Sequence, residues 1–396
     1  MTEAADERLW TRAFVLCFVT NLCQGTAFNL FLHLPGYLHE LGADDVQIGG
    51  ISSLTALAAV ALRPPVGRAM DRVGRRPVIL WGGALHALAT GLYLAVDRLG
   101  PLLYGVRVLH GFAEALLFSA LFAYAADRVP ARRRTEGLAL FGVSGMLPIS
   151  LGGWIGDGLL PRHGFAALFA LATLLALLSF LLSFLMTEPP RPAPSPGAVT
   201  GARAALRQGD LRPLWVLGTV FSIALTAFFV FIKRFVDDTG IGSVGLFFTA
   251  YTGAALALRL FLGWLPDRVG PKRVLAPALL ALTVGFFVMA GAATDRSLVT
   301  AGLLCGIGHG FTFPILFGLV VTRTPEENRG TTLALFTALF DLGVLLGGPL
   351  FGLVIERLGF AAMYGLAGAG LGLGSLVFFA WDGRTGRRAS GAGRHA

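Results

Sequence analysis

The chain has 396 residues, of which 55% are apolar and only 14% are charged, and its mean hydropathy is +0.71. Soluble globular proteins carry roughly 25% charged residues, and one or two soluble cores would not bury this much apolar surface. Composition therefore excludes soluble enzymes, nucleic-acid-binding domains and disordered chains, although the formal net charge of +9 alone would suit a nucleic-acid binder.

Twelve apolar segments are predicted, each long enough to cross the hydrocarbon core of a bilayer as a helix. They are 13–38, 47–69, 78–97, 101–125, 136–160, 164–186, 214–236, 242–265, 273–293, 297–321, 330–355 and 359–381. A proline-rich run at 189–197 cannot remain helical and marks a linker. The predicted fold is an all-α membrane protein of two pseudo-symmetric six-helix halves. Its parts are an N-terminus (1–12), a first half (13–186), a linker (187–213), a second half (214–381) and a disordered tail (382–396).

The basic residues alternate between the two ends of these segments. Of the 32 lysines and arginines, 23 lie at the side of the two termini, six lie at the opposite side, and Arg63, Arg107 and Arg259 lie within segments. Loops rich in basic residues stay in the cytoplasm. The sequence therefore predicts a multi-pass protein of the cell (inner or plasma) membrane with both termini cytoplasmic, and a monomer is expected.

Short motifs recur in the two halves at nearly constant spacing. Arg63-x3-Gly67-x3-Asp71-Arg72-Val73-Gly74 returns 196 residues later as Arg259-x3-Gly263-x3-Asp267-Arg268-Val269-Gly270, and His110-Gly111-Phe112 returns 199 residues later as His309-Gly310-Phe311. The segments 138–141, 152–153 and 164–167 each return 195 residues later. Five matches in one order indicate a duplication. Two repeated halves are typical of transporters in which one half rocks against the other around a central site.

The loop between the second and third predicted helices carries a family resemblance. Its sequence, Gly67-Arg68-Ala69-Met70-Asp71-Arg72-Val73-Gly74-Arg75-Arg76, resembles the signature loop of the major facilitator superfamily, and a degenerate copy runs from Gly263 to Arg273. Arg107-x3-Gly111 is similar to the fourth-helix motif of proton-coupled members. The resemblance covers essentially the whole chain. It implies a twelve-helix transporter similar to the small drug and metabolite exporters of that superfamily.

The same loop has a physical interpretation. Turns at Gly67 and Gly74 bring Asp71, Arg72, Arg75 and Arg76 to the membrane edge, where a carboxylate can pair with an arginine or with a positive helix N-terminus. The resemblance implies that Asp71 does so across the halves and acts as a conformational latch. Asp267 and Arg268 occupy the equivalent positions of the second copy. The alternative is that the basic cluster only fixes topology.

Ionisable side chains within the predicted helices are the candidate site residues, because a charge inside the bilayer needs a partner or a wet cavity. Arg107, His110 and Glu114 share one face of the fourth helix, at spacings of three and four residues. Asp341 and His309 lie at similar depth in the second half. These residues predict a proton- or substrate-handling site between the halves, with Arg107 holding Glu114 ionised. The alternatives are a purely structural Arg107–Glu114 pair and histidines that only pack.

Polar residues near the ends and in the middle of helices add further candidates. Gln24 and Asn21 in the first helix either line the same cavity or join helices by hydrogen bonds. Lys233 and Arg234 lie near the outer end of the seventh helix and are expected to extend towards the interface. Turned inward, they would instead favour an anionic substrate.

These features favour a secondary active transporter that moves a small organic molecule by alternating access, with proton-coupled export (antiport) as the leading hypothesis. The fifth-helix segment 142–153 only partly matches the Gly-Pro-x-x-Gly-Gly motif of antiporters, because Leu147 replaces a glycine and three residues separate Pro148 from Gly152. A proton-coupled importer of a sugar or organic acid is the alternative, and a non-transporting receptor or scaffold is a third. No enzyme, cofactor, metal or nucleic-acid partner is predicted. The expected partners are the substrate, protons and the lipid bilayer.

Overall fold

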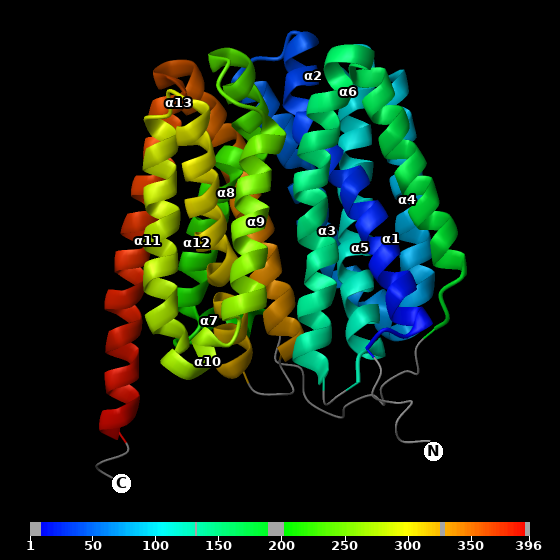
Figure 1. Cartoon of the computed structure of the whole chain (residues 1–396). Helices are drawn as coiled ribbons and strands as arrows, with labels where there is room; N and C mark the ends of the chain where they lie inside the picture. Colours follow the sequence, from blue (N-terminus) through cyan, green and yellow to red (C-terminus); the bar gives the residue numbers. More distant parts are fainter. Residues whose placement is uncertain (1–8, 131–132, 189–201, 325–328, 393–396) are drawn as a thin grey trace.

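The structure is a computed structural model that describes residues 9–130, 133–188, 202–324 and 329–392. Over these ranges it consists of helices and their connections, without strands (Figure 1). Ten of the helices are long and apolar enough to cross a membrane. This part of the chain therefore has the all-α membrane architecture that its composition predicts.

Two of the ten candidate helices are much longer than one crossing requires. α6 (Arg134–Phe184) has 51 residues and α13 (Arg329–Ala392) has 64, whereas a hydrocarbon core of about 30 Å needs about 20. Each is broken by a glycine in the left-handed region, Gly164 with φ 69° and Gly359 with φ 81°. Each therefore folds into two segments, and the ten candidates accommodate the twelve predicted crossings.

The first half contains α1 (Arg12–Asn29), which continues through a 3-10 turn (Leu30–His33) into α2 (Leu34–Glu40), and then α3 (Asp45–Val73), α4 (Arg75–Leu92), α5 (Pro101–Arg128) and α6. A second 3-10 turn covers Tyr93–Ala95. The second half contains α8 (Arg212–Thr239), α9 (Val244–Leu262), α10 (Leu265–Val269), α11 (Pro271–Ala290), α12 (Asp295–Thr322) and α13.

Two details differ from the predicted boundaries. A short helix, α7 (Ala202–Arg207), lies within the predicted linker, and α13 continues to Ala392, through most of the tail that was expected to be disordered. The proline-rich run at 189–197 lies outside the described residues.

Local capping explains where several helices begin. Asp44 accepts a hydrogen bond from the Gln47 backbone N–H (2.6 Å) while the Gln47 side chain accepts one from the Asp44 N–H (3.2 Å), which forms a capping box at the start of α3. Thr294 and Ser297 make the same arrangement at α12. These caps satisfy backbone N–H groups at the helix N-termini that have no partner inside the helix.

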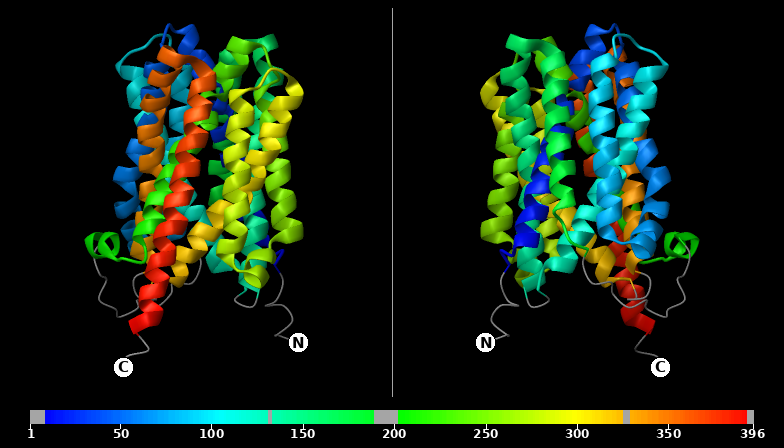
Figure 2. Two further views of the ribbon diagram at one scale, coloured as in Figure 1. Left: turned by 90° about the vertical axis from the view of Figure 1, so that its left-hand side faces the viewer. Right: turned by 90° about the vertical axis from the view of Figure 1, so that its right-hand side faces the viewer.

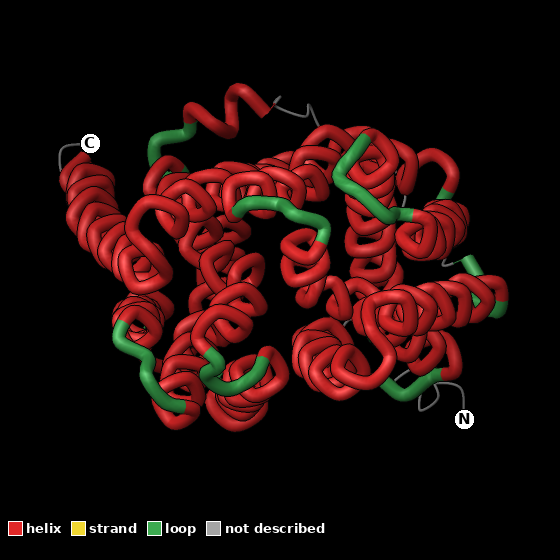
Figure 3. The backbone as a smooth tube through the Cα atoms, turned by 90° about the horizontal axis from the view of Figure 1, so that it is seen from above, coloured by secondary structure: helices red, strands yellow, loops and turns green. Residues whose placement is uncertain are grey.

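Both termini lie at one end of the bundle, which we call the terminal end, and the other end is the opposite end. In Figure 1 and in both views of Figure 2 the start of α1 and the last turns of α13 lie at the same end of the bundle, on different sides of it, and the last turns of α13 extend beyond the bundle there. Seen from the opposite end, the helices form two groups side by side (Figure 3). These groups are the two halves.

At the opposite end the two halves meet backbone to backbone. A Cβ added at Gly49 of α3 would lie 2.1 Å from the carbonyl oxygen of Gly348 in α13, and one at Gly352 would lie 2.2 Å from that of Asp45. On the other side of the molecule, a Cβ at Gly153 of α6 would lie 2.8 Å from Cα of Gly245 in α9. Glycine at these positions permits the close approach of the helices.

Polar contacts join the halves at the same end. Arg234 Nε donates to Asp45 Oδ1 (3.1 Å) between α8 and α3. The Gly245 N–H donates to Asp157 Oδ2 (2.6 Å), and the hydroxyls of Ser150 and Thr249 are hydrogen-bonded at 2.8 Å. The opposite end of the seam between the halves is therefore closed.

Candidate functional site

Asp341 pairs across the seam between the two halves. Arg63 of α3 binds it in a bidentate manner, with Nε donating to Oδ2 and Nη2 donating to Oδ1 (3.1 Å). The two side chains are only 13% and 14% exposed. The sequence pointed to Asp341 as a site residue, whereas Arg63 stood out only as the first residue of the repeated motif and as one of three arginines inside the predicted helices.

Glu114 lies beside this pair. Gln24 Nε2 of α1 donates to Glu114 Oε2 (2.6 Å), and both Arg63 and Asp341 act electrostatically on the Glu114 carboxyl group. The Arg63 guanidinium also lies 5.7 Å from the ring centroid of Phe118, one turn beyond Glu114 on α5. We call Gln24, Arg63, Glu114 and Asp341 the seam cluster. It combines α1, α3 and α5 of the first half with α13 of the second.

Arg107 has different partners from those predicted. Its Nε donates to the Ile51 carbonyl (3.2 Å), and Nη2 donates to the Ser52 carbonyl (2.9 Å). α5 approaches α3 so closely that a Cβ at Gly111 would lie 2.5 Å from the Thr55 carbonyl oxygen. The predicted Arg107–Glu114 pairing is therefore wrong, because the guanidinium donates its hydrogen bonds to carbonyl groups of the adjacent helix α3 instead.

The two predicted histidines lie within separate halves. His110 is fully buried, its Nδ1 is 3.5 Å from the Tyr93 hydroxyl, and its ring centroid is 5.1 Å from that of His86. His309 is hydrogen-bonded to the Tyr251 hydroxyl and packs edge-on against Phe221, with the ring centroids 5.4 Å apart. The structure thus brings the two acids together at the seam, while each histidine contacts its own half.

Asn21 joins two helices of the first half. Its Nδ2 donates to Ser144 Oγ (2.8 Å), which links α1 to α6. A Cβ at Gly145 would contact only Asn21 Nδ2, at 3.9 Å. Asn21 therefore makes a helix–helix hydrogen bond next to a position of α6 where a methyl group would fit.

The signature loop binds carboxylates of its own half and of the residues that directly follow that half. Glu188 accepts hydrogen bonds from the backbone N–H groups of Arg75 (2.7 Å) and Arg76 (2.8 Å) at the start of α4, which suits the positive end of a helix. The Arg75 side chain donates to Asp127 Oδ2 (2.9 Å). The side chain of Asp71 lies outside the described residues, so its latch role stays a prediction.

The remaining loop residues are placed as follows. Gly74 has φ 98°, a left-handed conformation that glycine adopts without strain, and it separates α3 from α4, whereas Gly67 lies inside α3. Arg72 and Asp267 are exposed. Arg268 is also exposed and lies 4.9 Å over the Trp264 ring.

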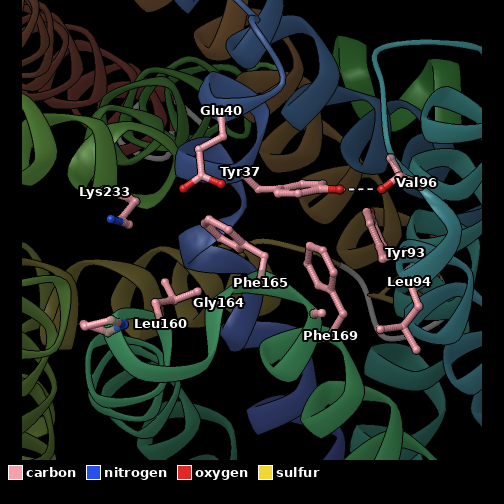
Figure 4. Close-up of a pocket in the computed structure, with 12 residues that line it drawn as sticks. Tyr37, Glu40, Tyr93, Leu94, Val96, Leu160, Gly164, Phe165, Phe169 and Lys233 are labelled. Carbon is pink, nitrogen blue, oxygen red and sulfur yellow. Dashed lines mark hydrogen bonds between the residues drawn. The ribbon is translucent and has the colours of Figure 1, made fainter.

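A separate pocket of about 530 Å³ lies at the opposite end of the bundle. Figure 4 shows the rings of Tyr37, Phe165 and Phe169 grouped together, with Glu40 above them and Lys233 to their left. Lys233 is paired with Asp237 of its own helix. The pocket shares no residue with the seam cluster. Among the described residues, no group of three or more His, Cys, Asp or Glu side chains is arranged to hold a metal ion.

Comparisons with known proteins agree with this architecture. The profile described as the Major Facilitator Superfamily matches residues 14–244 and 214–395. The staphylopine export protein of Staphylococcus aureus (strain Mu50 / ATCC 700699) is 26% identical over 353 residues, covering 86% of this chain and 88% of that protein. The uncharacterized MFS-type transporter YhhS of Escherichia coli (strain K12) is 27% identical over 350 residues, covering 85% and 84%.

Solved structures show the same fold. The nucleoside transporter NupG superimposes with a TM-score of 0.77 at 15% identity, covering 94% of this chain and 99% of that one. The human organic anion transporter MFSD10 (TETRAN) gives a TM-score of 0.73 at 19% identity, covering 93% and 99%. With a profile match over nearly its whole length, the chain belongs to the Major Facilitator Superfamily and is a multi-pass membrane transporter rather than an enzyme.

Proposed function

We propose that this protein is a proton-coupled exporter that moves a small organic molecule by alternating access, with the seam cluster as its proton-coupling site. The observation that carries the proposal is the Arg63–Asp341 pair, which joins the two halves directly beside Glu114. A carboxylate in this position connects the binding of a proton to the movement of one half against the other.

Protonation changes the strength of this connection. Uptake of a proton by Asp341 removes its negative charge, and the bidentate ion pair becomes a weaker neutral contact. Arg63 is then free to turn towards Glu114, which lies one turn before Phe118, the residue over whose ring the guanidinium is placed. One proton thereby weakens a contact that must break when the halves separate, which is the coupling that antiport requires.

The closed opposite end supports the alternating-access part of the proposal. Backbone contacts at Gly49, Gly153 and Gly352 seal that end, while Arg75 and Arg76 at the terminal end bind within their own half. We take this as the conformation that faces the terminal side. The excess of basic residues at that side supports a cytoplasmic location for both termini.

Export is supported by sequence similarity to the staphylopine export protein over most of both chains. It also agrees with the predicted likeness to small drug and metabolite exporters. Import by proton symport predicts the opposite sign of flux, so a flux measurement separates the two functions.

The test begins with a screen of drugs, amino acids, sugars and organic acids for export by a host that lacks its own pumps. Flux of the compound identified is then measured in inverted vesicles under an imposed pH gradient. Acidification of the lumen is expected to drive the compound into the vesicles. In Glu114→Gln and Asp341→Asn we expect gradient-driven flux to fall by at least tenfold, with insertion into the membrane unchanged.

The matched control is Asp238→Asn, which neutralises an exposed carboxylate at the end of α8 and is expected to keep full flux. Full gradient-driven flux in both seam variants would exclude the proposed coupling site. Flux of the compound out of the inverted vesicles would instead show that the protein is an importer.

A further inference from the structure

Arg259 of α9 is the arginine that corresponds to Arg63 in the internal repeat, but its charge is not balanced in the same way. It is partly buried, and its Nε donates one long hydrogen bond, 3.4 Å, to the Gly310 carbonyl. A guanidinium carries five N–H donors. Among the residues that the structure describes, no carboxylate pairs with it. A cation within a membrane-spanning helix normally has a counter-charge.

The repeat explains why no acidic partner of Arg259 is found in the described part of the chain. The residue 195 positions before Asp341 is Met146, and the residue 199 positions after Glu114 is Phe313. The arginine is therefore repeated, but the counterparts of both acids are apolar: Met146 of the first half stands at the position equivalent to Asp341, and Phe313 of the second half at the position equivalent to Glu114. Phe313 also packs against Phe336 and Phe340, with ring centroids 6.2 Å and 5.6 Å apart.

The Arg259 side chain crosses the seam towards α6. Among the described residues, a Cβ added at Gly142 would contact only Nη1 of Arg259, at 3.7 Å, and one added at Gly145 would contact only Asn21 Nδ2. At these two positions α6 therefore leaves room for at least a methyl group beside a guanidinium and an amide. Lys233 and Arg234, the other cations considered for an anion site, are already paired with Asp237 and Asp45.

We propose that Arg259 binds the oxyanion group of the transported compound, and that this compound is an organic anion with an apolar body. The inference rests on the proposed transport function and specifies its substrate class. The anion supplies the counter-charge that Asp341 supplies to Arg63, and the apolar part contacts the aromatic side chains of the second half. A planar carboxylate fits the bidentate donor geometry of arginine.

The test measures equilibrium binding to the purified full-length protein in lipid nanodiscs, without a proton gradient. The probes are 1-naphthoate, indole-3-acetate and adipate, each compared with its uncharged amide. We expect at least one carboxylate to bind wild-type protein about tenfold or more tightly than its amide, as one charge-assisted hydrogen bond provides. Arg259→Gln should abolish this preference and leave amide binding unchanged, while Arg259→Lys should retain part of it.

Arg296→Gln, at an exposed position in the second half, is the matched control and should keep the wild-type preference. Thermal unfolding of each variant checks that it is folded. Absence of a carboxylate preference for all three probes in wild-type protein, or its persistence in folded Arg259→Gln, would overturn the inference. Because no gradient is applied, the binding result is independent of proton coupling, which the vesicle experiment tests.

Discussion

Arg63 and Asp341 neutralise one another inside the membrane, so the effect of replacing one depends on the other. With 13% and 14% exposure, each loses most of its hydration and depends on its partner. Removing one member of such a pair leaves an uncompensated charge, which costs more than removing both.

We therefore expect Asp341→Asn to lower the free energy of unfolding by about 3 kcal/mol, and Arg63→Gln to have a similar effect. The double variant should recover most of that loss, because no isolated charge remains. Thermal unfolding of the wild-type protein, the two single variants and the double variant in one detergent provides a double-mutant cycle. Additive losses in the double variant would show that the two side chains do not interact.

The sequence identified the two acids of the seam cluster but not the residues that pair with them. Glu114 and Asp341 were recognisable as acids at similar depth in the two halves, and the structure brings them to one cluster. Their partners were not recognisable: Gln24 is 90 residues from Glu114, and Arg63 is 278 residues from Asp341. Spacing along one helix suggested Arg107 as a partner, but the neighbouring helix supplied carbonyl oxygens instead.

At the scale of elements, the two copies of the signature loop differ in one contact. Gly74 and Gly270 both have positive φ, 98° and 101°, so alanine is strained at either position. A Cβ at Gly74 would also lie 2.2 Å from Glu188 Oε1, whereas one at Gly270 would meet nothing within 4 Å. The Gly74 variant therefore displaces the carboxylate that caps α4.

We expect Gly74→Ala to destabilise the protein by about 1 kcal/mol more than Gly270→Ala, which is the contribution of a carboxylate at a helix N-terminus. This difference in stability should disappear when each of the two substitutions is made separately in a Glu188→Gln background. Thermal unfolding of the two glycine variants, in the wild-type and in the Glu188→Gln background, measures this difference. Equal destabilisation by the two substitutions in the wild-type background would show that Glu188 does not stabilise this loop.

At the scale of the whole molecule, the proposed alternating access requires the opposite end to open. The hydroxyls of Ser150 in α6 and Thr249 in α9 are 2.8 Å apart and belong to different halves. Cysteines at these two positions are close enough to form a disulfide when the opposite end is closed.

In a Ser150→Cys, Thr249→Cys protein whose native cysteines are replaced, oxidation is expected to reduce flux by at least tenfold, and a reductant should restore it. Each single-cysteine variant is the control and should be insensitive to oxidation. Unchanged flux in a fully cross-linked sample would mean that these two helices do not separate during transport.

The amino-acid sequence by itself determined the membrane-spanning segments, the duplication and the family, because each depends on local hydrophobicity or on motifs within a few residues. It also identified Glu114 and Asp341, since an acid inside an apolar segment is unusual wherever its partner lies. Only the tertiary structure decided which charges pair, that the opposite end is closed and that Arg259 has no acidic partner among the residues the structure describes. Those features depend on helix faces from distant parts of the chain, and their contact is set by close backbone packing such as that of Gly49 on Gly348.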